Sequence, residues 1–185
     1  MNKNLLKYLL LLSITILSAC AGGVNSLYFS DYPLTTGKVS SQSGSFSVLL
    51  PKGWFIAEDN ELRINEIWLI KEDYSASISF IPINVDSSTA SQLAAGGLQE
   101  LKRLNITFRK AKIGNKPVSI LNEELFQINS NDFLAYEYPD ENNAKIRVVL
   151  FKFEGKFYEC SAIPASAQNL DELFNIQNTL LTSIQ

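Results

Sequence analysis

The clearest secondary-structure signal in the chain is KIRVVLFKFEGKFYECSAI, residues 145–163. It predicts two strands, 145–153 and 156–163, joined by Glu154-Gly155 as a tight hairpin turn. The apolar side chains of the first strand alternate onto both faces: Ile146, Val148 and Leu150 on one, and Val149, Phe151 and Phe153 on the other. Because a strand that is apolar on both faces is covered on both faces, the hairpin predicts a sheet buried between two layers.

Further strands are predicted on the N-terminal side of this hairpin, as short apolar runs separated by turn residues. In the first, 46–50, the apolar residues Phe46 and Val48 alternate with Ser45 and Ser47, and the turn Pro51-Lys52-Gly53 follows the strand. Pro82 either ends the strand predicted over residues 74–80 or places that strand at the edge of a sheet, because proline has no N–H to donate to a neighbouring strand. The remaining predicted strands are 54–56, 66–70, 74–80, 124–128 and 133–138.

Two helices complete the predicted architecture. Asp86-Ser87-Ser88 caps a helix that runs to about Asn105, and Gly96-Gly97 inside it indicates either close packing on a sheet or a local break. The last helix begins near Ser166 or Asn169. Its buried stripe consists of Leu170, Leu173, Phe174, Leu180, Leu181 and Ile184. This order of elements predicts an α+β fold, a single domain with an antiparallel β-sheet flanked by helices.

The N-terminus has the layout of a secretory signal. Lys3 and Lys7 precede an apolar run that is too short to span a bilayer. The run ends in Leu17-Ser18-Ala19-Cys20, which resembles the lipobox of bacterial lipoproteins. The resemblance implies a signal peptide over residues 1–19 and lipid attachment at Cys20, which becomes the acylated amino terminus. The alternative, an ordinary signal with a chance cysteine, fits the small residues before Cys20 less well.

After the signal we expect a lipid-anchored tether, residues 20–43, and then one domain, residues 44–185. The tether is rich in Gly, Ser and Thr, as flexible linkers are. Four large apolar side chains interrupt it: Leu27, Tyr28, Phe29 and Tyr32. Part of the tether is therefore expected to pack back on the domain. The residue after Cys20 is Ala21. An Asp at this position resembles an inner-membrane retention signal, so its absence favours attachment to an outer membrane, with the domain facing the periplasm.

Composition excludes several classes of chemistry. The chain has no histidine and a formal net charge of −3. Without histidine, neither Ser-His-Asp nor Cys-His activation can form, and the commonest metal ligand is missing. An acidic balance without a basic cluster argues against nucleic acid. We therefore predict no catalytic residue, no metal site and no cofactor. Cys160 is either buried or reactive, and its alternation with Tyr158 and Ala162 favours burial.

Pairs of acidic residues could in principle serve carboxylate catalysis. Neighbours on a strand point to opposite faces, and the other pairs fall in turns or at a helix start, so we expect solvated surface. Asp140–Asn143 offers oxygen ligands for a weak calcium loop, but the EF-hand spacing is missing, which favours a plain hairpin turn. The pairs are Glu58-Asp59, Glu72-Asp73, Glu123-Glu124, Asp140-Glu141 and Asp171-Glu172.

The stretch FSVLLPKGW, residues 46–54, resembles the opening of PsbP-like and DcrB-like domains, in which an apolar strand runs into Pro-x-Gly-Trp. The order of elements over residues 44–185 is similar as well. The resemblance implies an α/β/α sandwich and a non-catalytic role, as in accessory subunits of photosystem II and many envelope lipoproteins. Some photosynthetic members bind metals through histidine, which this chain lacks. Trp54 fits a core aromatic better than a ligand-binding residue.

Together these features favour a non-enzymatic, membrane-anchored envelope lipoprotein that binds or helps to assemble another envelope protein. The alternative is a periplasmic carrier of a lipid or other apolar ligand, suggested by the aromatic content of 11%. A hydrolase that works through carboxylates is the least supported. The expected partners are the membrane, through the lipid on Cys20, and a second envelope protein. The sequence leaves the oligomeric state open.

Overall fold

The computed structural model describes residues 26–58, 64–112, 117–166 and 169–185. Within these residues seven strands form one sheet in the order β3-β4-β5-β9-β8-β7-β6, and β1 pairs with β2 separately. Every neighbouring pair is antiparallel. The elements are β1 (Leu34–Ser40), β2 (Ser47–Pro51), β3 (Trp54–Ile56), β4 (Ile67–Lys71), β5 (Ala76–Ile83), α2 (Ser87–Lys112), β6 (Asn122–Ile128), β7 (Asn131–Pro139), β8 (Lys145–Phe153), β9 (Lys156–Pro164) and α3 (Leu170–Thr182).

The predicted hairpin of β8 and β9 lies in the middle of this sheet, because β9 also pairs with β5. Phe153 pairs with Lys156 across the turn. The two turn residues, Glu154 and Gly155, have φ angles of 45° and 82°. Positive φ at both central residues is what a type I′ turn requires, and its twist matches that of the flanking strands. β8 has the predicted bounds, and β9 runs one residue further, to Pro164.

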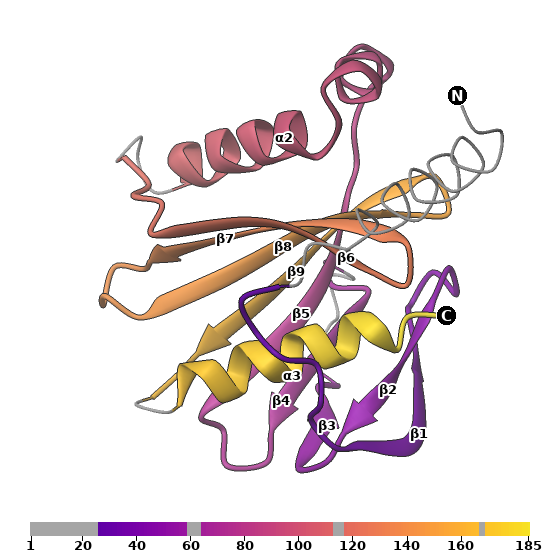
Figure 1. Cartoon of the computed structure of the whole chain (residues 1–185), viewed down its shortest axis with the longest axis vertical. Helices are drawn as coiled ribbons and strands as arrows, with labels where there is room; N and C mark the ends of the chain where they lie inside the picture. The colour runs from indigo at the N-terminus through magenta and orange to yellow at the C-terminus, as the bar shows by residue number, and fades with distance from the viewer. Residues whose placement is uncertain (1–25, 59–63, 113–116, 167–168) are drawn as a thin grey trace, which may run out of the picture.

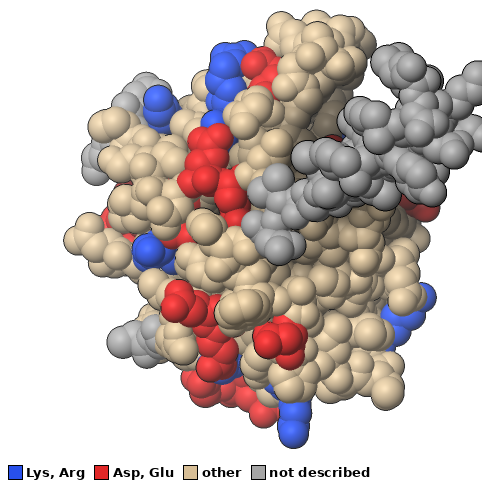
Figure 2. All heavy atoms as spheres, viewed as in Figure 1, with Lys and Arg blue, Asp and Glu red and all other residues tan. Residues whose placement is uncertain are grey.

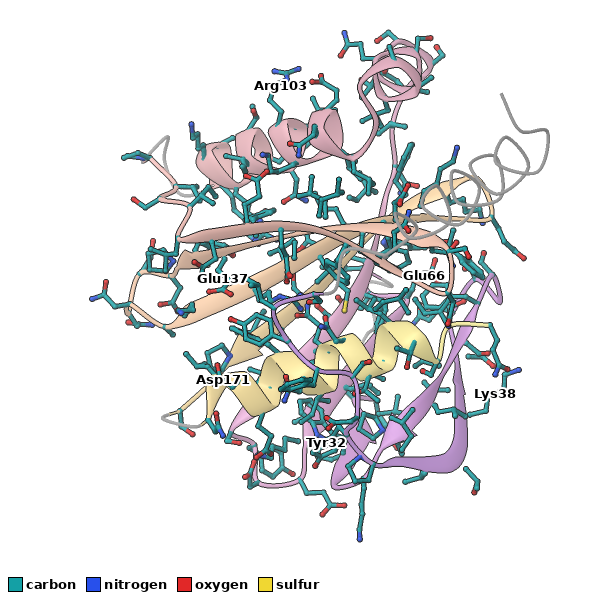
Figure 3. All side chains as sticks on the ribbon, viewed as in Figure 1. Tyr32, Lys38, Glu66, Arg103, Glu137 and Asp171 are labelled. Carbon is teal, nitrogen blue, oxygen red and sulfur yellow. The ribbon has the colours of Figure 1, made fainter. Side chains whose placement is uncertain are left out.

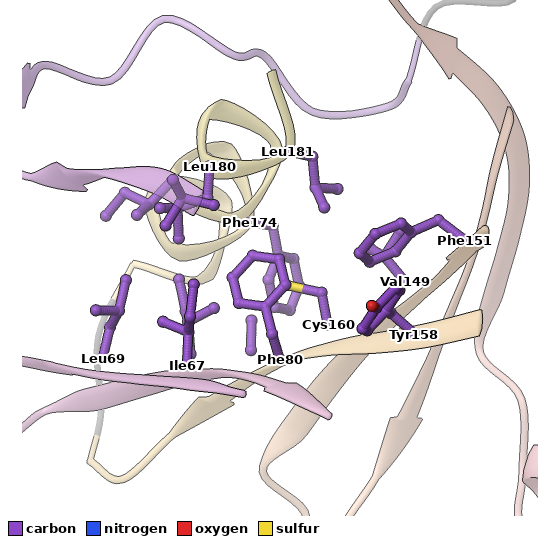
Figure 4. Close-up of a cluster of buried hydrophobic side chains, with 14 of the residues drawn as sticks. Ile67, Leu69, Phe80, Val149, Phe151, Tyr158, Cys160, Phe174, Leu180 and Leu181 are labelled. Atoms are coloured by element: carbon purple, nitrogen blue, oxygen red, sulfur yellow. The ribbon is translucent and has the colours of Figure 1, made fainter. Parts of the chain in front are cut away.

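Two helices cover the two faces of the sheet, α3 on one and α2 on the other (Figure 1). Alternate residues of β8 divide between two hydrophobic cores: Val149 and Phe151 pack under α3, and Val148 and Leu150 pack under α2. Figure 4 shows Phe174, Leu180 and Leu181 of α3 above the sheet residues of the first core. The fold predicted from the hairpin, an antiparallel sheet between helices, is confirmed.

Cys160 and Trp54 both lie in the core under α3, as predicted. Cys160 is fully buried, and burial raises the pKa of its thiol to about 12. A thiol with this pKa stays protonated near neutral pH, as expected of a cysteine buried in an apolar core. Trp54 is 3% exposed, which fits the prediction of a core aromatic.

The long helix α2 is broken at Gly97. Asp86 caps its start as predicted, because its Oδ1 accepts from the Thr89 amide at 2.7 Å and from the Ser88 hydroxyl at 2.9 Å. Gly97 has φ 59° and ψ −147°, a region that is essentially open to glycine alone. Of the two predicted explanations for Gly96-Gly97, the local break is therefore correct. Neither helix described is long and apolar enough to cross a membrane.

Both ends of strand β5, Ala76–Ile83, differ from the predicted strand 74–80. Tyr74 was predicted to start β5, but it lies in the preceding turn with φ 60°. Pro82 lies inside β5 and does not end it. β4 pairs with β5 only as far as Phe80, so beyond that residue β5 has β9 alone as a neighbour. Strand β5 lies between β4 and β9, so neither predicted alternative holds for the strand as a whole. Pro82 is tolerated because the end of β5 beyond Phe80 has a free side, where no N–H is needed.

The expected tether over residues 20–43 needs correction in its C-terminal part. Strand β1, Leu34–Ser40, was not predicted, and it pairs with β2 from Ser40 opposite Ser47 to Leu34 opposite Pro51. Tyr28 and Tyr32 pack against the core under α3, which confirms that part of the segment packs back. The folded unit therefore begins well before residue 44. Residues 1–25, with the predicted signal and Cys20, lie outside the described residues.

Helix α3 should be indispensable for folding. Leu173, Phe174, Ile176, Leu180 and Leu181 are each at most 2% exposed. At about 1.5–3 kcal/mol for each buried side chain, their loss exceeds the stability of an ordinary domain. A chain that ends at residue 168 should therefore show no cooperative unfolding transition by calorimetry. A retained transition would show that α3 is peripheral.

A matched pair of substitutions refines this test. Leu180→Ala, at a fully buried position, should lower the free energy of unfolding by about 2–5 kcal/mol. Leu125→Ala, at a position 54% exposed on the edge strand β6, should change it by about 0.5 kcal/mol or less.

Candidate functional site

The N-terminal strap, which we define as residues 26–32, crosses helix α3 on its outer side (Figure 1). Its first residue follows the predicted lipid-attachment site, Cys20, by six residue steps. Cys20 itself lies outside the described residues. The strap is therefore the nearest described segment, along the chain, to the predicted membrane anchor, and its attachment to the domain is the feature most relevant to function.

Arg147 on β8 is the residue on which the strap is seated. Its side chain points into the α3 layer and is fully buried. Nη2 donates to Glu124 Oε1 at 2.6 Å, while Nη1 donates to Gln177 Oε1 at 2.7 Å and Asn178 Oδ1 at 3.0 Å. These groups come from β6 and α3, so one guanidinium joins the edge of the sheet to the helix that covers it.

Aromatic rings enclose the same guanidinium. Its central carbon lies 4.9 Å from the ring centroid of Tyr28, 5.6 Å from that of Phe126 and 5.9 Å from that of Phe174. Burial lowers the pKa of Arg147, and the hydrogen bond and charge of Glu124 oppose that effect. Cation–π contact and the charge-assisted hydrogen bond together offset part of the cost of burying the cation.

Ser26 and Leu27 bind the carboxylate that pairs with Arg147. The Ser26 hydroxyl lies 3.1 and 3.0 Å from the two oxygens of Glu124, and the Leu27 amide donates to Oε2 at 2.7 Å. Ser26 Oγ in turn accepts from Asn178 Nδ2 at 2.8 Å. The start of the strap thus completes the coordination of a buried ion pair.

Tyr28 points inward from the strap. Its hydroxyl donates to Glu137 Oε1 at 2.6 Å, its carbonyl accepts from Asn178 at 2.8 Å, and its ring meets that of Phe174 edge-on at 5.0 Å. Burial, followed by the hydrogen bond and charge of Glu137, raises the pKa of the Tyr28 phenol. The phenol therefore stays protonated and remains a hydrogen-bond donor at physiological pH.

The rest of the strap is hydrogen-bonded to side chains of α3. The Phe29 amide donates to Asn175 Oδ1 at 2.9 Å and the Tyr32 amide to Thr179 Oγ1 at 3.1 Å. The Tyr32 hydroxyl reaches the carbonyl of Lys52 at 3.0 Å. Glu137 and Tyr32 lie on opposite sides of α3 in Figure 3, so the strap crosses the helix between them. This coverage explains why Asn178 and Thr179, outside the predicted stripe, are buried.

One acidic residue of this site, Glu124, is less exposed than predicted. Glu124 was expected on the solvated surface, yet its side chain is only 11% exposed and pairs with Arg147. Its neighbour Glu123 points to the other face, where it pairs with Lys102 at 2.7 Å. Alternation along β6 was therefore predicted correctly, but the layer that Glu124 enters is buried because the strap and α3 cover it.

Glu124 and Glu137 lie on the same face of neighbouring strands, and each has a cationic partner. Glu137, 2% exposed, pairs with Lys145 at 3.3 Å and accepts from Asn122 at 2.8 Å. Here two carboxylates face two cations under a strap, an arrangement that holds structure together.

The other acidic pairs are separate from this site. Glu72-Asp73 lies in the turn between β4 and β5, and Asp171-Glu172 lies in the first turn of α3, where Asn169 caps the helix as predicted. Asp140 accepts from the amides of Asn142 and Ala144 in the β7–β8 turn, which confirms a hairpin turn. Glu58 is exposed, and Asp59 lies outside the described residues. The described part of the chain contains no cluster of His, Cys, Asp and Glu that could hold a metal.

A second buried ion pair lies on the opposite face. Arg109, near the end of α2, binds Glu159 of β9 and donates to the hydroxyl of Tyr136 at 2.9 Å. Asn105 donates to the other oxygen of Glu159 at 2.6 Å. These contacts fasten the second half of α2, after its break at Gly97, to the sheet.

Two surface clefts bear on the carrier alternative. One, of about 520 Å³, is lined by Arg109, Lys112, Tyr138, Asp140 and Glu141 among others. The other, of about 600 Å³, lies between the β7–β8 turn and the start of α3. Both are open to solvent and carry charged side chains. An apolar ligand is usually held in an enclosed site, and neither of these two clefts is enclosed.

Comparison with known proteins adds one finding. No protein-family model and no curated protein sequence matches the chain. Among solved structures, the solution structure of cyanobacterial PsbP (CyanoP) from Synechocystis sp. PCC 6803 matches with a TM-score of 0.55 at 15% sequence identity. The match covers 89% of this chain and 98% of the other. The chain has a PsbP-like fold. The expected resemblance to this fold is thereby confirmed.

The buried ion pair supplies a stability prediction. Arg147→Met leaves the Glu124 carboxylate buried without its cation, and should lower the free energy of unfolding by about 3–5 kcal/mol. The double variant Arg147→Met, Glu124→Gln removes both charges and should recover part of that loss. Urea denaturation measures both, with Arg103→Met as the control.

Arg103 pairs with Glu100 at 2.6 Å on the solvent side of α2, and its side chain is 62% exposed. Because solvent screens that pair, the control should unfold like the wild type. Equal stability of Arg147→Met and the control would show that the buried pair does not hold the strap and α3 in place.

Proposed function

We propose that the chain is a lipid-anchored, non-enzymatic accessory protein of a bacterial cell envelope, which binds another envelope protein. The observation that carries the proposal is the seat of the strap on Arg147, six residue steps after the lipobox cysteine. An extended chain of that length reaches about 20 Å, less than the width of a domain. A lipid on Cys20 would therefore hold the domain against the membrane and not at the end of a long tether.

The lipobox supports the anchor itself. Two or three acyl chains bury enough methylene groups, at about 0.8 kcal/mol each, for stable attachment. Ala21 after the cysteine favours an outer membrane in an organism that has one, with the domain in the periplasm. These statements rest on residues 17–21 of the sequence.

A non-enzymatic role is supported by the state of the charged groups. Both buried carboxylates of the strap site are paired, Cys160 is a buried thiol, and histidine is absent from the sequence. Such a domain contributes a surface. The PsbP-like fold is consistent with this role, since the resemblance noted in the sequence is to a mostly non-catalytic group of accessory proteins.

Two measurements on membranes test the proposal. The wild type should incorporate labelled palmitate and partition into detergent, whereas Cys20→Ser should stay unlabelled and keep its signal peptide. Cross-linking in the native envelope should then yield a defined complex of the wild type with a second protein, and Cys20→Ser should form less of it because it is not held at the membrane.

An unlabelled wild type that stays in the aqueous phase would contradict the anchor. Native mass spectrometry of the purified protein separates the remaining alternatives. A stoichiometric co-purifying lipid, beyond the covalent one, together with no protein complex would support the carrier and contradict the binding role.

A further inference from the structure

The strap holds two large apolar side chains out in water. Leu27 is 66% exposed and Phe29 is 75% exposed. Their backbones are fixed, because the Leu27 amide binds Glu124 and the Phe29 amide binds Asn175. Tyr28 between them points into the core. The two side chains thus face outward while Tyr28 points inward, and the hydrogen bonds of the strap to Glu124 and Asn175 hold them there.

We propose that Leu27 and Phe29 insert into the surface of the membrane that carries the lipid, and so turn the α3 face toward the bilayer. The proposal rests on the proposed lipid anchor at Cys20. Leu27 follows Cys20 by seven residue steps, which an extended chain covers in about 25 Å. The lipid and these two side chains are therefore confined to the same side of the domain.

The chemistry of the site matches the boundary between headgroups and acyl chains. An apolar element that lies at a membrane surface buries its side chains about 5–10 Å deep, and Phe and Leu are typical residues there. The covalent lipid provides the affinity, while two rigidly held side chains fix the orientation. Loss of the strap's seat would leave the anchor intact but free the domain to rotate.

The surface charge of the protein determines which lipid headgroups it can contact. Figure 2, whose view includes α2 at the top as well as α3 and the strap below, shows a side of the molecule that is largely uncharged, with acidic residues in several groups and Lys and Arg mostly toward its margins. The whole chain carries a formal charge of −3. A zwitterionic phospholipid surface therefore fits this face, and a strongly anionic one does not.

The orientation leaves the α2 face turned away from the membrane. Phe108 on α2 is 67% exposed, nearly as exposed as Phe29, and the sheet separates the two. A membrane that lies against the α3 face is separated from α2, the helix of Phe108, by the sheet. Phe108 is therefore a matched control for the side chains of the strap.

The test uses the full lipidated protein in phosphatidylcholine vesicles. Phe29→Cys and Phe108→Cys each receive a thiol-reactive spin label. Cys160 does not compete, because it is fully buried with a raised pKa, and the thiol of Cys20 carries the lipid. Electron paramagnetic resonance then compares collisions of each label with oxygen, which concentrates in lipid, and with a water-soluble nickel complex.

At position 29 we expect several-fold more collisions with oxygen relative to nickel than at position 108. Equal, water-like values at both positions in protein that floats with the vesicles would overturn the inference and leave the lipid anchor standing. A lipid-like value at position 108 would overturn it as well, because the opposite face would contact the membrane. Protein that carries no lipid and does not float would overturn both the inference and the proposed anchor.

Discussion

The structure depends on one buried cation. Arg147 lies in a central strand, on a face that otherwise receives Val149 and Phe151, and a charge there is tolerated only if it is paired and hydrogen-bonded. Glu124 supplies the countercharge at Nη2, and Gln177 and Asn178 of α3 accept the hydrogen bonds of Nη1. Removal of Glu124 would leave the cation without a countercharge, and removal of Gln177 or Asn178 would take a hydrogen-bond acceptor from it. The edge strand β6, the helix α3 and the strap are therefore coupled through a single side chain.

The strap completes this network by binding both members of the ion pair. Ser26 and Leu27 bind Glu124, and the ring of Tyr28 covers the guanidinium. A segment that would otherwise be a loose connection is thereby made part of the domain. Its outward side chains, Leu27 and Phe29, become a defined surface, on which the proposed orientation at a membrane depends.

The elements with a strong periodic signal could be predicted from the sequence. β8 and β9 alternate over nine residues each, and the Glu154-Gly155 turn fixes their pairing. The strap and β1 have no such signal. Ser26 meets Glu124 and Asn178 across 98 and 152 positions, and no local pattern relates polar residues so far apart. One signal was available: Arg147 occupies an alternation position between apolar neighbours, which places its charge in a buried layer that must also contain a partner.

The strap is a fixed part of the fold, held in place at Arg147 and Glu124. Amide hydrogen exchange followed by NMR measures this directly, because the amides of Leu27, Phe29 and Tyr32 donate to side chains of the domain. In the wild type, exchange at these amides should be far slower than in an unstructured peptide. In Arg147→Met, the same amides should exchange fast while the amides of β8 and β9 stay protected. Exchange at the rate of an unstructured peptide in the wild type, with β8 and β9 protected, would contradict a fixed strap.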